Sequence, residues 1–125
     1  MGCIIQEFQQ EQKRRMRAVQ DAMYVLNGKW KIAIISSICC FKKRRFSEIV
    51  NDVEGISNRM LSKELKELEV NQLIKRTVLE TQPITVQYEL TEHGDTLQTI
   101  IMNLEDWGVV HRKKIVGETR PVSVG

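Results

Sequence analysis

The segment from about Ser57 to Asn71 constrains the fold most, because its apolar and basic side chains fall on opposite faces of one expected helix. Leu61, Leu65 and Leu68 recur at four- and three-residue spacing, which places them on one helix face. At about 100° per residue, the opposite face carries Arg59, Ser62, Lys63 and Lys66. Such a helix fits the shape and chemistry of the DNA major groove. An ordinary solvated helix face has the same pattern, so the neighbouring segments must decide between the two interpretations.

Those neighbouring segments predict further helices and a β-hairpin. Periodicity, breakers and caps set the boundaries: Asn27-Gly28 ends a helix, and the Ser57 hydroxyl suits an N-cap because it can accept a free backbone N–H. Alternating β-branched residues indicate the two strands. In chain order, we expect a helix over about Gln10–Leu26, a buried helix with Trp30 that ends near Cys40, a basic turn Phe41–Arg45, a short helix Phe46–Val53, a turn Glu54–Ile56, the leucine-anchored helix, strands Ile74–Glu80 and Val86–Leu90 joined by Thr81–Thr85, and a last helix capped by Thr91.

Helix, basic turn, helix, tight turn, helix and hairpin, in this order, form the winged helix-turn-helix arrangement, so the expected fold class is α+β. Several motifs add to this order: Asn27-Gly28-Lys29-Trp30-Lys31, Arg44-Arg45-Phe46-Ser47-Glu48-Ile49, Gly55-Ile56-Ser57, Leu61-Ser62-Lys63-Glu64-Leu65-Lys66-Glu67-Leu68-Glu69, Tyr88-Glu89-Leu90-Thr91-Glu92-His93-Gly94 and Trp107-Gly108-Val109-Val110-His111. Taken together, they closely resemble successive motifs of the HxlR family of bacterial transcriptional regulators. The resemblance implies a dimeric DNA-binding regulator related to MarR-type proteins, with the helix from Ser57 as recognition helix and the hairpin as wing.

The length of 125 residues predicts a single winged-helix domain. We expect an N-terminal dimerisation helix over about residues 10–26, a winged helix-turn-helix core over 27–90, a C-terminal dimerisation helix over 91–116 and a flexible tail over 117–125.

Two apolar stripes predict how the homodimer forms. Residues 16, 19, 23 and 26 follow three-four-three spacing, which makes a seam that needs either the chain's own core or another subunit. The expected interface comprises Met16, Val19, Met23, Leu97, Ile101, Leu104 and Trp107. A dimer would present two recognition helices to successive major grooves, so the operator should be roughly palindromic, with half-sites about one turn (~10 bp) or a simple multiple apart.

The candidate DNA contacts divide into base and backbone contacts. Arg59 lies in the first helical turn, where it can contact a guanine edge or clamp a phosphate, and Asn58 can contact adenine or merely extend the helix start. The basic turn would meet phosphates or serve as a solubilising loop, and Arg76 would clamp the backbone or form a surface ion pair. The expected contacts are Lys42, Lys43, Arg44, Arg45, Ser57, Asn58, Arg59, Ser62, Lys63, Lys66, Arg76, Gln82 and Thr85. Glu64, Glu67 and Glu69 are expected to be solvated or paired with lysines.

The chain departs from the family pattern at two positions. Many family members carry a sensing cysteine before the first helix, where this chain has Arg17, so thiol sensing by that route is not expected. The wing strand commonly begins with Arg or Lys, where this chain has Thr85. The wing therefore lacks a cation at that point and would contact phosphate or sugar by hydrogen bonds.

Several classes of function are disfavoured. Cys3, Cys39 and Cys40 show no metal-ligand spacing, and no phosphate-binding glycine loop, HExxH or GxSxG motif occurs, so no catalytic residue, metal or cofactor is expected. No apolar run approaches the roughly 18 residues of a membrane span, and no secretory signal is evident, so a cytoplasmic protein is expected. The net charge of +3 is modest, so the distribution of charge matters more than its total. Two alternatives to a plain DNA-binding regulator stay open: a winged-helix module for protein–protein contact, and a regulator gated by a small-molecule effector between the dimer helices.

Overall fold

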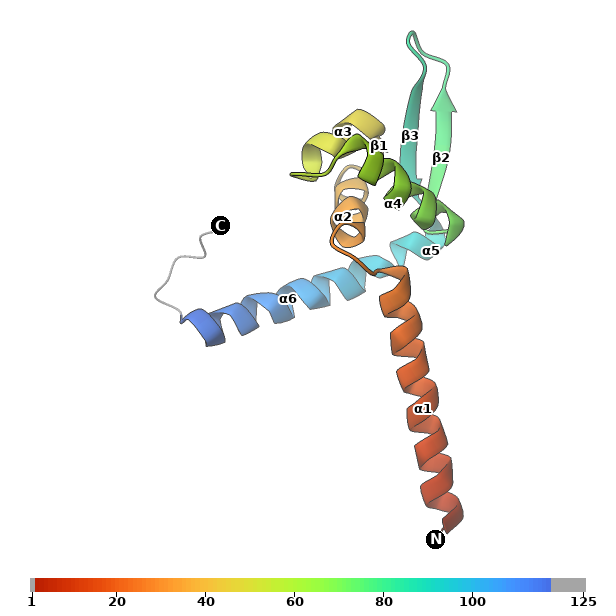
Figure 1. Ribbon diagram of the computed structural model, residues 1–125, viewed down its shortest axis with the longest axis vertical. Helices are drawn as coiled ribbons and strands as arrows, with labels where there is room; N and C mark the ends of the chain where they lie inside the picture. Colours follow the sequence, from red (N-terminus) through yellow and green to blue (C-terminus); the bar gives the residue numbers. More distant parts are fainter. Residues whose placement is uncertain (1, 118–125) are drawn as a thin grey trace.

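The computed structural model shows a winged-helix head with two long helices projecting from it (Figure 1). It describes the backbone of residues 2–117 and the side chains of residues 4–117. In chain order, the elements are α1 (Gly2–Val25), α2 (Lys31–Phe41), β1 (Lys43–Arg45), α3 (Phe46–Asp52), α4 (Asn58–Val70), β2 (Ile74–Leu79), β3 (Thr85–Leu90), α5 (Glu92–Asp95) and α6 (Leu97–Val116). This order confirms the predicted α+β winged helix-turn-helix fold.

The core of the head forms where the isoleucines of α2 meet the leucines of α4. Ile34, Ile35 and Ile38 are fully buried and pack with the stripe predicted for α4. In that stripe, Leu61 and Leu68 have no exposed surface, and Leu65 is 1% exposed. Burying each of these side chains is worth about 1.5–3 kcal/mol, so the stripe fixes which face of α4 points away from solvent.

The wing belongs to a three-stranded antiparallel sheet of order β1-β3-β2. Tyr88 in the central strand is the register partner of Arg44 on one side and of Arg76 on the other. The prediction of a basic turn over Phe41–Arg45 was wrong. Phe41 ends α2, and Lys42 makes the bend with a φ of 66°. The next three residues then pair with β3, which satisfies backbone groups that a turn would leave to water.

The terminal helices differ from their predicted extents. Helix α1 begins at Gly2 rather than near Gln10. The last helix is interrupted at Thr96, so the predicted cap Thr91 begins the short α5, where its hydroxyl accepts a hydrogen bond from Gly94 N at 2.9 Å. The predicted flexible tail falls almost entirely on residues 118–125, which lie outside the described residues. None of the described helices is long and apolar enough to cross a lipid bilayer.

Candidate nucleic-acid interface

Helix α4 presents a basic face to solvent because its apolar face is held by the core. Ser57 caps the helix as predicted, since its hydroxyl accepts a hydrogen bond from Met60 N at 3.1 Å. The predicted contact residues of this helix are all exposed: Asn58, Arg59, Ser62, Lys63 and Lys66. The first turn therefore exposes the amide of Asn58 and the guanidinium of Arg59 to solvent, and the following turns expose the ammonium groups of Lys63 and Lys66.

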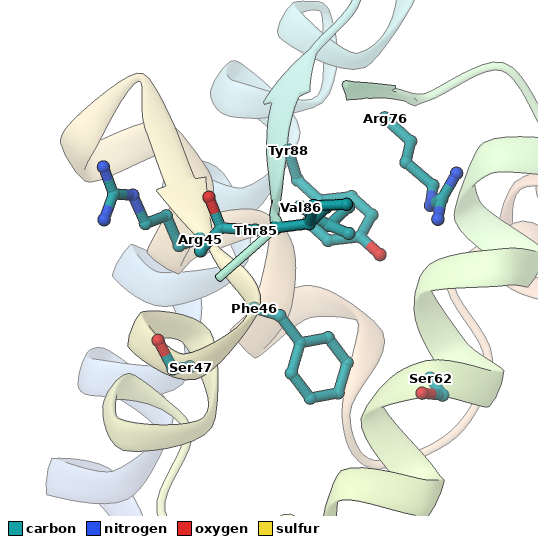
Figure 2. Close-up of a pocket in the computed structure, with 9 residues that line it drawn as sticks. Arg45, Phe46, Ser47, Ser62, Arg76, Thr85, Val86 and Tyr88 are labelled. Carbon is teal, nitrogen blue, oxygen red and sulfur yellow. The ribbon is translucent and has the colours of Figure 1, made fainter. Parts of the chain in front are cut away.

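The wing, the end of β1, the start of α3 and Ser62 of α4 line an open hollow of about 410 Å³. Figure 2 shows Arg76 extending from the wing toward α4, with Tyr88 and Ser62 on the walls of the hollow. Burial raises the pKa of the Tyr88 hydroxyl, although the Arg76 guanidinium beside it acts in the opposite direction. Tyr88 therefore stays a neutral phenol at physiological pH. Together, Arg76 and Ser62 provide a cation and a hydroxyl that can bind an anionic oxygen.

Arg44 lies in the predicted phosphate-contacting cluster but is engaged inside the head. Its Nε and Nη2 atoms donate to the two carboxylate oxygens of Asp52, both at 2.8 Å, and its Nη1 lies 3.0 Å from Glu48 Oε2. The guanidinium also stacks on the Phe41 ring at 3.7 Å. The Arg44 and Ser37 hydrogen bonds lower the pKa of Asp52. Only 17% of the Arg44 side chain is exposed, so this residue joins β1 to α3 rather than facing solvent.

The other cations of that cluster face solvent. Lys42, Lys43 and Arg45 are exposed, and Lys43 makes only a long contact of 3.8 Å with Glu89. Exposed ion pairs of this kind contribute little to stability, so Lys43 could bind a phosphate instead of Glu89. Arg45 lines the hollow, whereas Lys42 and Lys43 line a separate one beside Glu89 and Asp95.

The loop at the tip of the wing, residues 80–84, carries an exposed glutamate, Glu80, and an isoleucine, Ile84, that is 70% exposed, but no cation. Gln82 is exposed, and the Thr85 hydroxyl lies 2.9 Å from the Thr81 hydroxyl, which itself donates to the Pro83 carbonyl at 2.7 Å. The Thr85 hydroxyl thus already takes part in a hydrogen bond within the tip. Gln82 retains both its donor and acceptor groups for solvent or a ligand.

The apolar stripes of the terminal helices divide into buried and exposed parts. Leu97 and Ile101, predicted as dimer contacts, pack in part against the core of their own head. The remaining predicted contacts are exposed in the chain, at 62% for Met16, 58% for Val19, 67% for Met23, 52% for Leu104 and 66% for Trp107. The Trp107 ring stacks on His111 at a centroid distance of 4.7 Å.

The burial of Lys31 and Glu64 on the core side of α4 was not predicted from the sequence. Lys31, the first residue of α2, binds Glu64 and Glu67, so two of the three glutamates expected to be solvated or lysine-paired do have a lysine partner. A lysine at the start of an otherwise isoleucine-rich helix was the available signal, because a cation there needs a buried partner.

Comparison with known proteins identifies the family. The HxlR-like helix-turn-helix family matches residues 25–115, which span the head and most of α6. The chain belongs to this family. The HTH-type transcriptional regulator YtcD of Bacillus subtilis is 36% identical over 109 residues, covering 87% of this chain and 86% of YtcD. This HxlR-like chain is accordingly a transcriptional regulator of the helix-turn-helix type.

Solved structures of the same kind share its fold. The redox regulator HypR in its reduced form superimposes with a TM-score of 0.73 at 34% identity, over 78% of this chain and 96% of HypR. Reduced YodB from Bacillus subtilis gives a TM-score of 0.63 at 36% identity, over 70% of this chain and 85% of YodB. In the HxlR-like regulator described here, Cys39 is half-buried. Its burial raises the pKa of the thiol, and the negative charge of Asp95 raises it further.

Proposed function

We propose that this HxlR-like regulator binds double-stranded DNA in a sequence-specific manner as a homodimer on a roughly palindromic operator. The observation that carries the proposal is the separation of faces on α4. Its leucines are buried, while Arg59, Lys63 and Lys66 are exposed on the other side. Arg76 approaches from the wing across the hollow (Figure 2), so one continuous surface offers both base-contacting and phosphate-contacting groups.

The exposed stripes of α1 and α6 support the homodimer. Both helices leave the head as extended arms (Figure 1), and large apolar side chains such as Met23, Leu104 and Trp107 lie on them in contact with solvent. Contiguous apolar surface of this extent is rare on monomers. A second copy would cover it and would set the separation of the two recognition helices.

We assign different roles to the cations of this surface. Arg59 projects from the first turn of α4, the part of a recognition helix that reaches base edges, and no described partner holds its guanidinium. Lys43 lies in β1 beside Glu89, outside the lining of the hollow at α4, and we assign it a phosphate contact only. At a promoter, the regulator would either block polymerase sterically or, as an activator, recruit it.

Selection of bound sequences from a random DNA pool, followed by titration of two variants, tests the proposal. Arg59→Ala should cost about 1–3 kcal/mol on the selected site, much less on random DNA, and flatten the preference at one base pair. Lys43→Ala should weaken both DNAs alike and reduce the slope of log K against log salt by about one.

Two outcomes would contradict the proposal or part of it. Recovery of no enriched sequence, with no DNA affinity at low salt, would favour the protein–protein module instead. Equal weakening of all sequences by both variants would make Arg59 a backbone contact and move base recognition to Asn58, Ser62 or Lys63.

A further inference from the structure

A buried ammonium links α2 to α4 and to the connection between α1 and α2. Lys31 is 3% exposed, and its Nζ donates to Glu64 Oε2 and Glu67 Oε2, each at 2.5 Å. It also donates to Asn27 Oδ1 at 3.2 Å. Glu64 and Glu67 lie one turn apart on α4, while Asn27 lies in the connection through which α1 leaves the head.

Stability alone does not account for these contacts. A cation removed from water is costly, and its attraction to buried carboxylates often does no more than offset that cost. Apolar side chains of similar volume can commonly replace such a pair without loss of stability. What an apolar pair lacks is direction, because a hydrogen-bonded ammonium between two carboxylates fixes both distance and angle.

Beside Lys31, the space between α1 and α4 is open rather than packed. A hollow of about 420 Å³ separates the end of α1 from the second half of α4, and Lys31 lies on its wall. The apolar side chains at its margins, Tyr24 and Val70, are 75% and 73% exposed, so they do not pack the two helices together. Val25, Leu26 and Trp30 pack in part against the core of the head. The ammonium adds the hydrogen bonds that join Asn27 of the connection to Glu64 and Glu67 of α4.

We infer that Lys31 is a positioning residue for DNA recognition, which sets the orientation of α4 and ties it to the connection leading to α1. This inference rests on the proposed function. In a homodimer, α1 would belong to the interface, so the same contact fixes each recognition helix relative to the dimer axis. Small errors in that orientation would displace the first turn of α4 from the base edges while leaving phosphate contacts almost intact.

The charges needed for this role persist at neutral pH. Burial lowers the pKa of Lys31, but the hydrogen bonds to Glu64 and Glu67 raise it by more, so the net change is upward. The Lys31 hydrogen bond likewise lowers the pKa of Glu67. Lys31 and Glu67 thus stay ionised across the physiological range.

A charge-neutral replacement separates positioning from electrostatics and from folding. The variant Lys31→Met/Glu64→Met removes one positive and one negative charge, so the long-range attraction to DNA is unchanged. We expect a melting temperature equal to or above that of the parent, and a ratio of operator affinity to random-DNA affinity that falls about tenfold, the equivalent of one base contact. The matched control, Glu11→Gln/Arg14→Gln, removes an exposed ion pair of α1 and should leave that ratio unchanged.

The outcomes distinguish this inference from the proposed function. A parent protein that shows no preference for any DNA sequence would overturn the proposed function itself. A parent with a clear preference and a folded Met pair with the same ratio would overturn the role of Lys31 alone. If the Met pair does not fold, the pair Lys31→Gln/Glu64→Gln retains hydrogen-bonding groups, and an unchanged ratio in that variant overturns the inference equally.

Discussion

Replacing Gly94 with alanine should destabilise the head, although alanine is the better helix former. Gly94 is buried in α5, and a Cβ there would lie 2.0 Å from the Leu73 carbonyl oxygen and 3.0 Å from its carbon. These neighbours are fixed, because Leu73 O accepts a hydrogen bond from Thr91 N at 3.0 Å, and the Thr91 hydroxyl donates to Gln72 O at 2.6 Å. The start of the wing and the start of α5 must therefore separate to admit the methyl group.

The size of the effect follows from three contributions. Forcing the extra methyl into a packed site costs about 1–3 kcal/mol, and weakening the Thr91–Leu73 hydrogen bond costs about 0.5–1.5 kcal/mol. The preference of a helix for alanine over glycine offsets about 0.5–1 kcal/mol of this loss of stability. The net loss is about 0.5–4 kcal/mol, which urea unfolding at a fixed protomer concentration measures directly.

Gly108→Ala is the matched control for this prediction. Within the chain, nothing lies within 4 Å of the position that its Cβ would take in α6, so inside one protomer only the helix preference acts and contributes about 0.5–1 kcal/mol. If Gly94→Ala proves as stable as the parent while Gly108→Ala shows the expected gain, the close packing of α5 on the end of α4 and the start of β2 is wrong.

Three further predictions concern assembly, oxidation and pH. A chain beginning at Asn27 should lose dimerisation and most DNA affinity, because the exposed stripe of α1 is absent; a tight dimer in analytical ultracentrifugation would contradict this. Diamide should leave operator binding nearly unchanged, because burial raises the pKa of Cys39 and Arg17 replaces the usual sensing cysteine; a several-fold loss that dithiothreitol reverses and Cys39→Ser abolishes would refute it. The pKa of Asp52 is lowered by Arg44, so its contribution to stability is present above the ordinary carboxyl pKa and is lost as pH falls through the folded value; Asp52→Asn should therefore be most destabilising near neutral pH, with a difference from the parent that shrinks in acid.

Features that depend on local sequence were predictable. The leucine stripe of α4, its Ser57 cap and the hairpin of β2 and β3 all follow from side-chain spacing within a few residues, and the structure contains each of them. The helix periodicity also identified which cations of α4 would be exposed. These predictions succeed because burial of one face decides the orientation of a short helix regardless of the rest of the chain.

Features that depend on distant partners were not predictable in this way. Lys43–Arg45 became a strand because β3 offers an open edge more than 40 residues further along the chain. The partner of Lys31 at Glu64 is 33 residues away. Arg44 has the same local context as Arg45, yet one side chain is held by Asp52 and the other faces solvent. Charge spacing alone gives no means of telling such pairs apart.

The distribution of paired and exposed cations bears on how specificity arises in a chain whose net charge is only +3. Arg44 and Lys31 are paired with carboxylates within the head, and the loop at the wing tip carries Glu80 but no cation, so fewer cations are left for DNA than the sequence alone suggests. Few counterions would then be released on binding, which keeps sequence-independent affinity low. Base contacts from the first turn of α4 must accordingly supply a larger share of the binding free energy. The orientation of that turn therefore matters more than the number of cations, and this is the property that the contacts of Lys31 control.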